Sequence, residues 1–428
     1  MLRRRRAPPA PPPSAAAVAR GVRGEARGLD ARAAWLLLLL RLAAAALVPL
    51  ADCDEVFNYW EPLHHLLYGF ALQTWEYSAA YALRSYLYLV LHVPIVLLTR
   101  VAASVLGGDK VSVFFGARAA LGALSAACEL RMLWSVCDAL GTRVACATAL
   151  LLATSAGMAH ASPALLPSSF AMCCLTLAIS HWMDALTTSA QSACSLRRSD
   201  GRAWAARAYP SAVWWVGVAS LVGWPFAALA GAPLALDAIA KLGLRHFARL
   251  IIRYGTILIV PTAALDSYFY GRPVASPINM LRYNLNLKGG AQLYGTEPAS
   301  FYVKNLLLNF GLALPAAIAA VPVLLLLAAT KSGRSAGPAS KADTARPSRD
   351  PPGVAEIADS ALGPLNTLLV LSPLYLWVVF FSAIPHKEER FLYPIYPLVA
   401  LAAAIAIDGT AELVCACFPV DANRRPPR

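Results

Sequence analysis

Long apolar stretches, separated by short polar segments, alternate along the chain from residue 33 to residue 417. A helix of about 17–25 apolar residues is long enough to cross the ~30 Å hydrocarbon core of a bilayer. Stretches of this kind are 33–50, 86–106, 111–135, 144–160, 165–183, 211–239, 247–266, 306–329, 361–384 and 394–417. Because proline removes a helical hydrogen bond, Gly223-Trp224-Pro225 should divide the sixth stretch into two shorter helices. The pattern predicts an all-α, polytopic membrane protein with about 10–11 transmembrane helices.

The composition favours the same class of protein. Hydrophobic residues make up 58% of the 428 residues and charged residues 14%, whereas a soluble domain carries about 25% charged residues. The formal net charge of +13 comes from four segments outside the apolar stretches, namely 1–32, 184–210, 331–350 and 421–428. Basic segments beside membrane spans stay in the cytosol, and these segments lack the interleaved aromatic residues that stack on bases. We therefore expect the lipid bilayer as a partner, and no nucleic acid.

The polar segments divide the chain into regions with different roles. Residues 1–32, rich in Arg and Pro, have too few apolar residues to build a core and are predicted to be a disordered basic cytosolic arm. Residues 33–417 form the predicted membrane-embedded domain. A Ser-, Pro- and Gly-rich insert at 331–360 interrupts it and is predicted to be a flexible cytosolic loop. Residues 418–428 are a basic tail.

The basic segments also predict which polar segments share a membrane face. With the basic segments in the cytosol, 51–85, 267–304 and 385–391 fall together on the lumenal side. Counting crossings along the chain leaves one crossing missing or extra before residue 144. We expect the stretch 86–106 to depart from a simple span, because a His, a Pro and an Arg interrupt it.

The sequence predicts no metal, cofactor or disulfide site. The nine cysteines show no ligand or redox spacing, and two pairs of them lie inside apolar stretches, where cysteine behaves as a small buried hydrophobe. The adjacent pair His64-His65 has no further ligand at a helical spacing. The sequence also has no Gly-rich phosphate loop for a soluble nucleotide.

A cluster of carboxylates directly follows the first apolar stretch. Four fall within ten residues, at Asp52, Asp54, Glu55 and Glu61, and charged groups at a membrane boundary are costly unless they have partners or a function. Transfer of a sugar to a hydroxyl group needs a base that accepts the hydroxyl proton. A carboxylate beside a second one, partly desolvated by aromatic residues, can have its pKa raised towards that task. The alternative is a solvated acidic loop.

A second charged segment, residues 386–391 with the sequence His-Lys-Glu-Glu-Arg-Phe, lies between the last two apolar stretches. Its cations can clamp a phosphate or diphosphate, the arginine through a planar donor fork, while the glutamates hold the cations in place. The alternative is an interfacial turn that anchors two helices.

A third polar region, residues 266–302, combines Tyr, Asn, Arg and Gly. Such a mixture is typical of surfaces that stack on sugars and form hydrogen bonds with them. An aromatic belt at the membrane interface is the alternative interpretation.

These motifs closely resemble those of a known enzyme family. The matching motifs are residues 52–55 (Asp-Cys-Asp-Glu), 58–62 (Asn-Tyr-Trp-Glu-Pro) and 73–77 (Gln-Thr-Trp-Glu-Tyr), and the resemblance covers most of 35–400. It continues through 160–162, 166–172, 223–227, 266–272, 294–298 and 386–391. The chain resembles the dolichyl-phosphate-mannose-dependent α-1,2-mannosyltransferases of asparagine-linked glycosylation, in glycosyltransferase family 22, which have the class C glycosyltransferase fold.

The resemblance implies an inverting, metal-independent transfer of mannose at the endoplasmic reticulum membrane, with the active site in the lumen. The implied donor is dolichyl-phosphate-mannose, and the implied acceptor is a dolichyl-diphosphate-linked oligosaccharide that receives mannose in α-1,2 linkage. Asp54 is then the expected base with Glu55 beside it, and the donor phosphate is expected near His386, Lys387 and Arg390. Acceptor or sugar binding is expected at Trp60, Glu61, Trp75, Tyr294 and Glu297.

Three alternatives compete with this hypothesis. A related mannosyltransferase would act on a glycosylphosphatidylinositol precursor or form an α-1,6 linkage. A transporter or lipid scramblase commonly shows paired halves, and the sequence has no internal repeat. The third is a shortened, inactive paralogue that acts as a scaffold, against which the intact Asp54 and 386–391 motifs argue.

Overall fold

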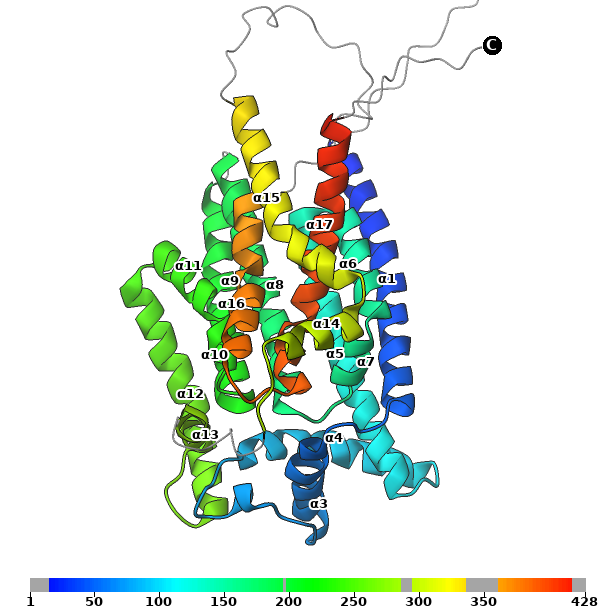
Figure 1. The fold of residues 1–428 in the computed structure, drawn as a ribbon, viewed down its shortest axis with the longest axis vertical. Coiled ribbons are helices and arrows are strands. Elements are labelled where there is room, and N and C mark those ends of the chain that lie inside the picture. The colour runs from blue at the N-terminus through cyan, green and yellow to red at the C-terminus, as the bar shows by residue number, and fades with distance from the viewer. Residues whose placement is uncertain (1–14, 195–197, 286–294, 336–360, 418–428) are drawn as a thin grey trace, which may run out of the picture.

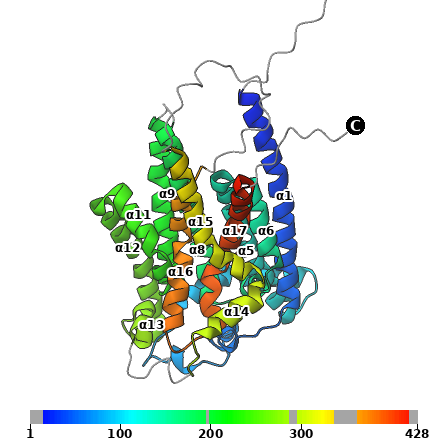
Figure 2. The same cartoon turned by 45° about the horizontal axis from the view of Figure 1, so that its top comes forward.

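The computed structural model describes residues 15–194, 198–285, 295–335 and 361–417, and every secondary-structure element in these ranges is a helix. The all-α prediction is therefore confirmed for them. The long helices stand side by side as a bundle (Figures 1 and 2), in which α8 packs against α9 and α15 against α17. The helices of the bundle are α1 (Ala15–Leu47), α5 (Lys110–Leu140), α6 (Thr142–Thr154), α8 (Pro167–Cys194), α9 (Arg198–Val218), α11 (Ala232–Leu242), α12 (Leu244–Tyr270), α15 (Ala313–Ser335), α16 (Pro364–Ala383) and α17 (Tyr396–Cys417).

Short elements gather towards the lower end of the bundle in Figure 1. They are α2 (Cys53–Glu55), the π-helix η1 (Val56–Trp60), α3 (Glu61–Tyr68), the 3-10 helix η2 (Trp75–Tyr77), α7 (Ala156–Ala161), the π-helix η3 (Ala219–Gly223), α10 (Ala227–Ala230), α13 (Ser276–Leu285), α14 (Ser300–Phe310) and the 3-10 helix η5 (Glu389–Ile395). The described parts of three polar segments, 51–85, 267–285 and 385–391, thus lie near one another at this end. The start of α1, the end of α8, the start of α9 and the ends of α15 and α17 lie at the upper end.

Seven helical segments of the described chain are long and apolar enough to cross a membrane, fewer than the predicted 10–11. They are Tyr86–Val105, Lys110–Leu140, Pro167–Ser189, Leu244–Tyr270, Ala313–Thr330, Pro364–Ala383 and Glu389–Cys415. Other predicted spans are divided. The stretch 144–160 breaks at Ser155 into α6 and α7. The expected break at Gly223-Trp224-Pro225 is confirmed, because Trp224 is extended between η3 and the short helices α10 and α11.

The helix α4 (Tyr86–Val105) lies across the lower end of the bundle in Figure 1, between α12 and α5. It therefore does not run from one end of the bundle to the other, although its length and hydropathy would allow it to cross a membrane. If α4 is not counted as a crossing, the number of crossings before residue 144 agrees with the predicted positions of the basic and lumenal segments. The stretch 86–106 was the one expected to depart from a simple span.

Two predicted loop boundaries differ from the structure. The helix α1 begins at Ala15, inside the segment 1–32 that was predicted to be a disordered arm, and Ala and Arg, which are frequent there, are strong helix formers. The helix α15 likewise continues to Ser335, inside the predicted insert 331–360. Residues 1–14, 336–360 and 418–428 lie outside the described residues.

A buried ion pair joins α1 to α5 in the interior of the bundle. The Arg41 guanidinium donates from Nε to Glu129 Oε1 at 2.9 Å and from Nη2 to Glu129 Oε2 at 2.7 Å. Arg41 Nη2 also donates to the carbonyl of Leu152 in α6, and Ser125 Oγ donates to Glu129 Oε1. Both charged side chains are at most 2% exposed, so each depends on the other for compensation of its charge.

Replacing Glu129 by alanine should destabilise the protein by about 3–5 kcal/mol, because it leaves the Arg41 guanidinium buried without a counter-charge. Thermal unfolding in detergent should show a clearly lower Tm. The double variant Arg41→Met/Glu129→Met should recover much of the loss, because apolar residues of similar size can replace a buried pair. A single variant as stable as the wild-type protein would show that the pair contributes little.

Candidate active site

A cavity of about 660 Å³ lies where the segments of the lower end meet. Its lining combines a group of charged side chains, called the charged wall, with a group of apolar side chains, called the apolar wall, so the cavity suits a ligand with a polar head and a hydrocarbon tail. The charged wall consists of Asp54, Glu76, Arg84, His386, Glu388 and Arg390. The apolar residues of the lining include Leu166, Pro167, Trp224, Phe226, Phe380, Phe381, Ile384 and Phe391. The helix α13 adds Met280, Tyr283, Asn284 and Leu285.

The turn after α1 fixes the position of Asp54. Asp52 is the N-cap of α2, and its Oδ1 accepts a hydrogen bond from the Asp54 backbone N–H at 2.9 Å. The chain continues directly into the π-helix η1 (Val56–Trp60), and π-turns are frequent at functional sites. A short, capped helix thus holds Asp54 at the edge of the cavity.

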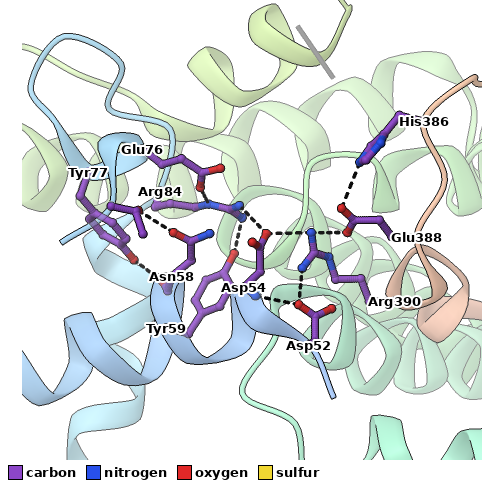
Figure 3. A network of polar contacts seen from close by, with 11 residues as sticks. Asp52, Asp54, Asn58, Tyr59, Glu76, Tyr77, Arg84, His386, Glu388 and Arg390 are labelled. Carbon is purple, nitrogen blue, oxygen red and sulfur yellow. Dashed lines mark hydrogen bonds and ion pairs between the residues drawn. The ribbon is translucent and has the colours of Figure 1, made fainter. Parts of the chain in front are cut away.

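Arg390 connects the two charged segments that the sequence separates by more than 300 residues. Its Nη1 lies 2.6 Å from Asp52 Oδ1, and its Nη2 lies 2.7 Å from Asp54 Oδ2 (Figure 3). The same guanidinium contacts Glu388. The two predicted motifs therefore form one site, held together by charge-assisted hydrogen bonds from a single planar group.

A second guanidinium, that of Arg84, approaches Asp54 from the opposite side (Figure 3). Its Nη2 lies 3.1 Å from Asp54 Oδ2, and it also contacts Glu76 and the Tyr59 hydroxyl. Both arginines contact the same oxygen of Asp54, and Oδ1 takes part in neither ion pair. From the sequence, Glu388 was expected to hold the neighbouring cations in place, whereas no role was predicted for Arg84 or Glu76.

The pKa of Asp52 indicates how strongly the site depends on its cations. Burial raises the pKa of Asp52 above its usual value, and the carboxylates of Glu388 and Asp54 add to this effect, whereas Arg390 lowers it. Four carboxylates face two guanidinium groups here. Loss of either guanidinium would leave like charges within a few ångströms of one another.

His386 lies at the other end of the charged wall, between two acceptors. Its Nε2 is 3.0 Å from Glu388 Oε1, and its Nδ1 is 3.1 Å from the Gly295 carbonyl. The hydrogen bond with Glu388 raises the pKa of His386, an effect that partial burial opposes. With an acceptor at each ring nitrogen, the geometry favours the imidazolium cation.

Lys387 is oriented differently from its neighbours. It is 6% exposed and does not line the cavity, and its Nζ donates to the carbonyls of Glu297, at 2.9 Å, and Ile384. Successive side chains of an extended segment point in opposite directions, and Glu388 is extended. The expected contact of Lys387 with a donor phosphate therefore does not fit this geometry, whereas a role in holding the 385–391 segment does.

Glu55 is also directed away from the cavity, although it was expected beside the base. It is 4% exposed, and its Oε1 accepts hydrogen bonds from the Leu165 backbone N–H and from Trp60 Nε1, both at 3.0 Å. Burial raises the pKa of Glu55, while these hydrogen bonds and Arg118 lower it. Glu55 thus joins the first loop to the segment before α8 and does not line the cavity.

The described residues that were expected to bind sugar do not line the cavity. Trp60 packs against Phe114, and Glu61 Oε2 accepts from the Leu72 N–H, so neither lines the cavity. Trp75 is exposed beside Tyr283, which does line it. Glu297 has an exposed side chain and contributes its carbonyl to Lys387. Tyr294 lies outside the described residues.

Among the described residues, Asp52, Cys53 and Asp54 bring ligand-type atoms within 4.8 Å of one another. Such a trio is able to hold a metal ion, but Arg390 already contacts both carboxylates. The positive charge that compensates them in this structure is therefore a guanidinium.

The arrangement of the bundle is shared with solved structures. It is similar to the crystal structure of ArnT from Cupriavidus metallidurans bound to undecaprenyl phosphate, with a TM-score of 0.56, 13% sequence identity and coverage of 92% of this chain and 66% of that chain. The apo structure gives a TM-score of 0.57. The bundle thus has the class C glycosyltransferase fold, and the predicted fold class is confirmed.

Similarity in sequence shows the family to which the chain belongs. A family model described as the Alg9-like mannosyltransferase family matches residues 33–420, and the chain belongs to this family. It is 36% identical over 375 residues to Alpha-1,2-mannosyltransferase ALG9 of Mus musculus and of Homo sapiens, covering 87% of this chain. The chain spans about half the length of these relatives, 53% in each case. GPI mannosyltransferase 3 of Yarrowia lipolytica is 27% identical over 156 residues, which is 36% of this chain and 22% of that protein.

Proposed function

We propose that the chain transfers mannose from dolichyl-phosphate-mannose to a dolichyl-diphosphate-linked oligosaccharide and forms an α-1,2 linkage. One observation carries the proposal. Asp54, partly exposed at the cavity, lies between the guanidinium groups of Arg84 and Arg390 and faces a lining with a large apolar part. The similarity to α-1,2-mannosyltransferases supports the choice of sugar and linkage.

The reaction requires one proton acceptor and one stabilised leaving group. An acceptor hydroxyl oxygen forms a bond to the anomeric carbon of mannose while the bond from that carbon to the phosphate oxygen breaks. The bonding electron pair leaves with dolichyl phosphate, and Asp54 Oδ1 takes the hydroxyl proton. Attack opposite the leaving group converts a β-linked donor into an α-linked product.

The remaining residues of the charged wall fit the leaving phosphate. His386 and Arg390 line the same cavity as Asp54, and both carry or favour a positive charge. Glu388 contacts both and holds them in orientation. The hydrocarbon chain of the donor would lie against the apolar wall, where its burial is favourable. Dolichyl phosphate is already a fair leaving group, so the reaction needs no separate proton donor.

We place this site in the lumen of the endoplasmic reticulum. The described helix ends next to the basic segments, namely the start of α1, the end of α8, the start of α9 and the ends of α15 and α17, lie at the upper end of the bundle in Figure 1. Basic segments next to membrane spans are retained in the cytosol. The cavity lies at the opposite end, which would then face the lumen. Dolichol-linked donor and acceptor would both be accessible there from the bilayer.

The proposal can be tested by profiling lipid-linked oligosaccharides in cells that lack their own α-1,2-mannosyltransferase of this pathway. Expression of the chain should restore elongation, and expression of Asp54→Asn to the same level should not. If the chain instead restored mannosylation of glycosylphosphatidylinositol precursors, it would be a mannosyltransferase of that pathway. The sequence similarity to such an enzyme is weaker. A folded, membrane-inserted chain that restores neither would favour the scaffold interpretation.

The charge of His386 should limit activity at alkaline pH. Because the pKa of His386 is raised by Glu388, the cation persists above the pH at which an ordinary histidine loses its proton, and activity should fall only as pH rises through that raised pKa. Replacing Glu388 by glutamine should move the alkaline limb of kcat/KM to lower pH. The matched control is Glu389→Gln, because Glu389 contacts Asn309 and not His386. An unshifted limb in Glu388→Gln would contradict this role of His386.

A further inference from the structure

Three aromatic side chains meet at the rim of the cavity. The ring of Trp75 lies 4.8 Å from that of Tyr81, at an interplanar angle of 82°, and 5.8 Å from that of Tyr283, at 49°. Trp75 is 39% exposed and Tyr81 49%, whereas Tyr283 lines the cavity. We call these three residues the aromatic rim. The first contact is edge-to-face and the second is tilted, so the three rings do not form a face-to-face stack.

The rim is close to the charged wall. Trp75 directly precedes Glu76 in the 3-10 helix η2, and Glu76 lines the cavity and contacts Arg84. Tyr283 belongs to α13, whose neighbouring Asn284 also lines the cavity. Glu76, the residue after Trp75, lies on the side of Arg84 away from Arg390 (Figure 3).

Hydrogen bonds fasten the two segments that carry the rim to each other. Arg272 Nε donates to the carbonyl of Ala79 at 2.5 Å. Asn279 Nδ2, in α13, donates to the carbonyl of Ala82 at 3.2 Å. These bonds flank Tyr81 on both sides, so the loop cannot change its distance from α13 without breaking them.

The end of α12 holds the same loop from its other side. Asp266 accepts hydrogen bonds from Ser85 Oγ at 3.0 Å and from the Tyr86 N–H at 2.8 Å. The Tyr270 hydroxyl donates to the carbonyl of Arg84 at 2.6 Å. The rim is therefore exposed but held in place, and such preorganisation lowers the entropic cost of binding a ligand.

We propose that the aromatic rim binds pyranose rings of the acceptor oligosaccharide next to the sugar that receives mannose. The apolar C–H face of a pyranose can pack on the exposed aromatic rings, and Asn284 supplies a polar partner for its hydroxyl groups. The proposed function assigns the hydrocarbon chain of the donor to the apolar wall, which leaves the rim available for the acceptor glycan. The assignment rests on the proposed mannosyltransferase function and adds where its acceptor binds.

The test compares two acceptors, a lipid-linked oligosaccharide with several mannose units and a lipid-linked acceptor with a single mannose. In Trp75→Ala and Tyr283→Ala, the KM for the long acceptor should rise about tenfold, the effect expected for one lost aromatic contact. The KM for the donor and the kcat should stay close to wild-type values. The KM for the short acceptor should change little, because it does not reach the rim.

Two further variants make the outcome decisive. Trp75→Phe should recover part of the affinity for the long acceptor, because it keeps an aromatic face. Phe70→Ala is the matched control, since Phe70 is 63% exposed near the same loop, packs against His64 and does not line the cavity.

The possible results are distinguishable. An unchanged KM for the long acceptor in both alanine variants would overturn the inference while leaving the proposed function intact. Equal losses with both acceptors, or a reduced kcat, would also overturn it, because Trp75 would then merely position Glu76 and Arg84. Absence of transfer by the wild-type chain would instead contradict the proposed function itself.

Discussion

Replacing Asp54 by asparagine should reduce kcat by about 10²–10⁴-fold, the contribution expected from a positioned general base. Asparagine keeps the size of the side chain and an acceptor oxygen for Arg84 or Arg390, but its amide cannot take a proton from the acceptor hydroxyl. The KM for both substrates should therefore change much less than kcat. Single-turnover transfer with purified protein in proteoliposomes would measure the chemical step directly.

Asp52→Asn is the matched control for this substitution. Asp52 also contacts Arg390, at 2.6 Å, but it caps α2 and does not line the cavity. We expect the kcat of the Asp52→Asn variant to fall less than tenfold, because the substitution weakens only a helix cap and an ion pair. An Asp52 variant as impaired as the Asp54 variant, or an Asp54 variant within a few-fold of wild-type, would show that Asp54 is not the base.

Replacing Arg390 by lysine should lower kcat/KM by about 10²–10³-fold, although the charge is kept. The planar guanidinium contacts Asp52, Asp54 and Glu388 at once, and an ammonium group cannot reproduce this fork. The charge of Arg390 also lowers the pKa of Asp52, and lysine keeps this charge but not the planar arrangement of donors.

Arg143→Lys provides the control for an arginine-to-lysine change. Arg143 pairs with Asp408 at 2.9 Å, and its side chain is 69% exposed, so its contribution to stability should be small. Thermal unfolding should separate the two effects, because Arg390→Lys should remain folded at the assay temperature. An Arg390→Lys variant with wild-type kcat/KM would contradict the bridging role of the guanidinium.

The sequence was sufficient for the class of fold, because apolar stretches of spanning length leave few options besides a helical bundle. It could not show that α4 lies across the bundle end. That helix is as apolar as the others, and only its packing against α12, α3 and α5 decides its direction. The Gly-Trp-Pro break was predictable, because proline acts locally on the helix.

The candidate site was only partly predictable from the sequence. Asp54 and Arg390 were identified from their motifs, and the structure brings them within 2.7 Å. The roles of Glu55 and Lys387 were not predictable, because adjacent charged residues look equivalent in a sequence and only the backbone geometry directs one into the cavity and its neighbour away. Arg84 and Glu76 were missed because their partnership with Asp54 depends on how a loop folds back.

The most direct test of the central claim is the linkage of the product that the purified chain forms from dolichyl-phosphate-mannose and a lipid-linked oligosaccharide. We expect one added mannose that an α-1,2-specific mannosidase removes and that Asp54→Asn fails to add. A product in β linkage, or transfer that persists in Asp54→Asn, would contradict the mechanism. No transfer by the folded wild-type chain would contradict the proposed activity.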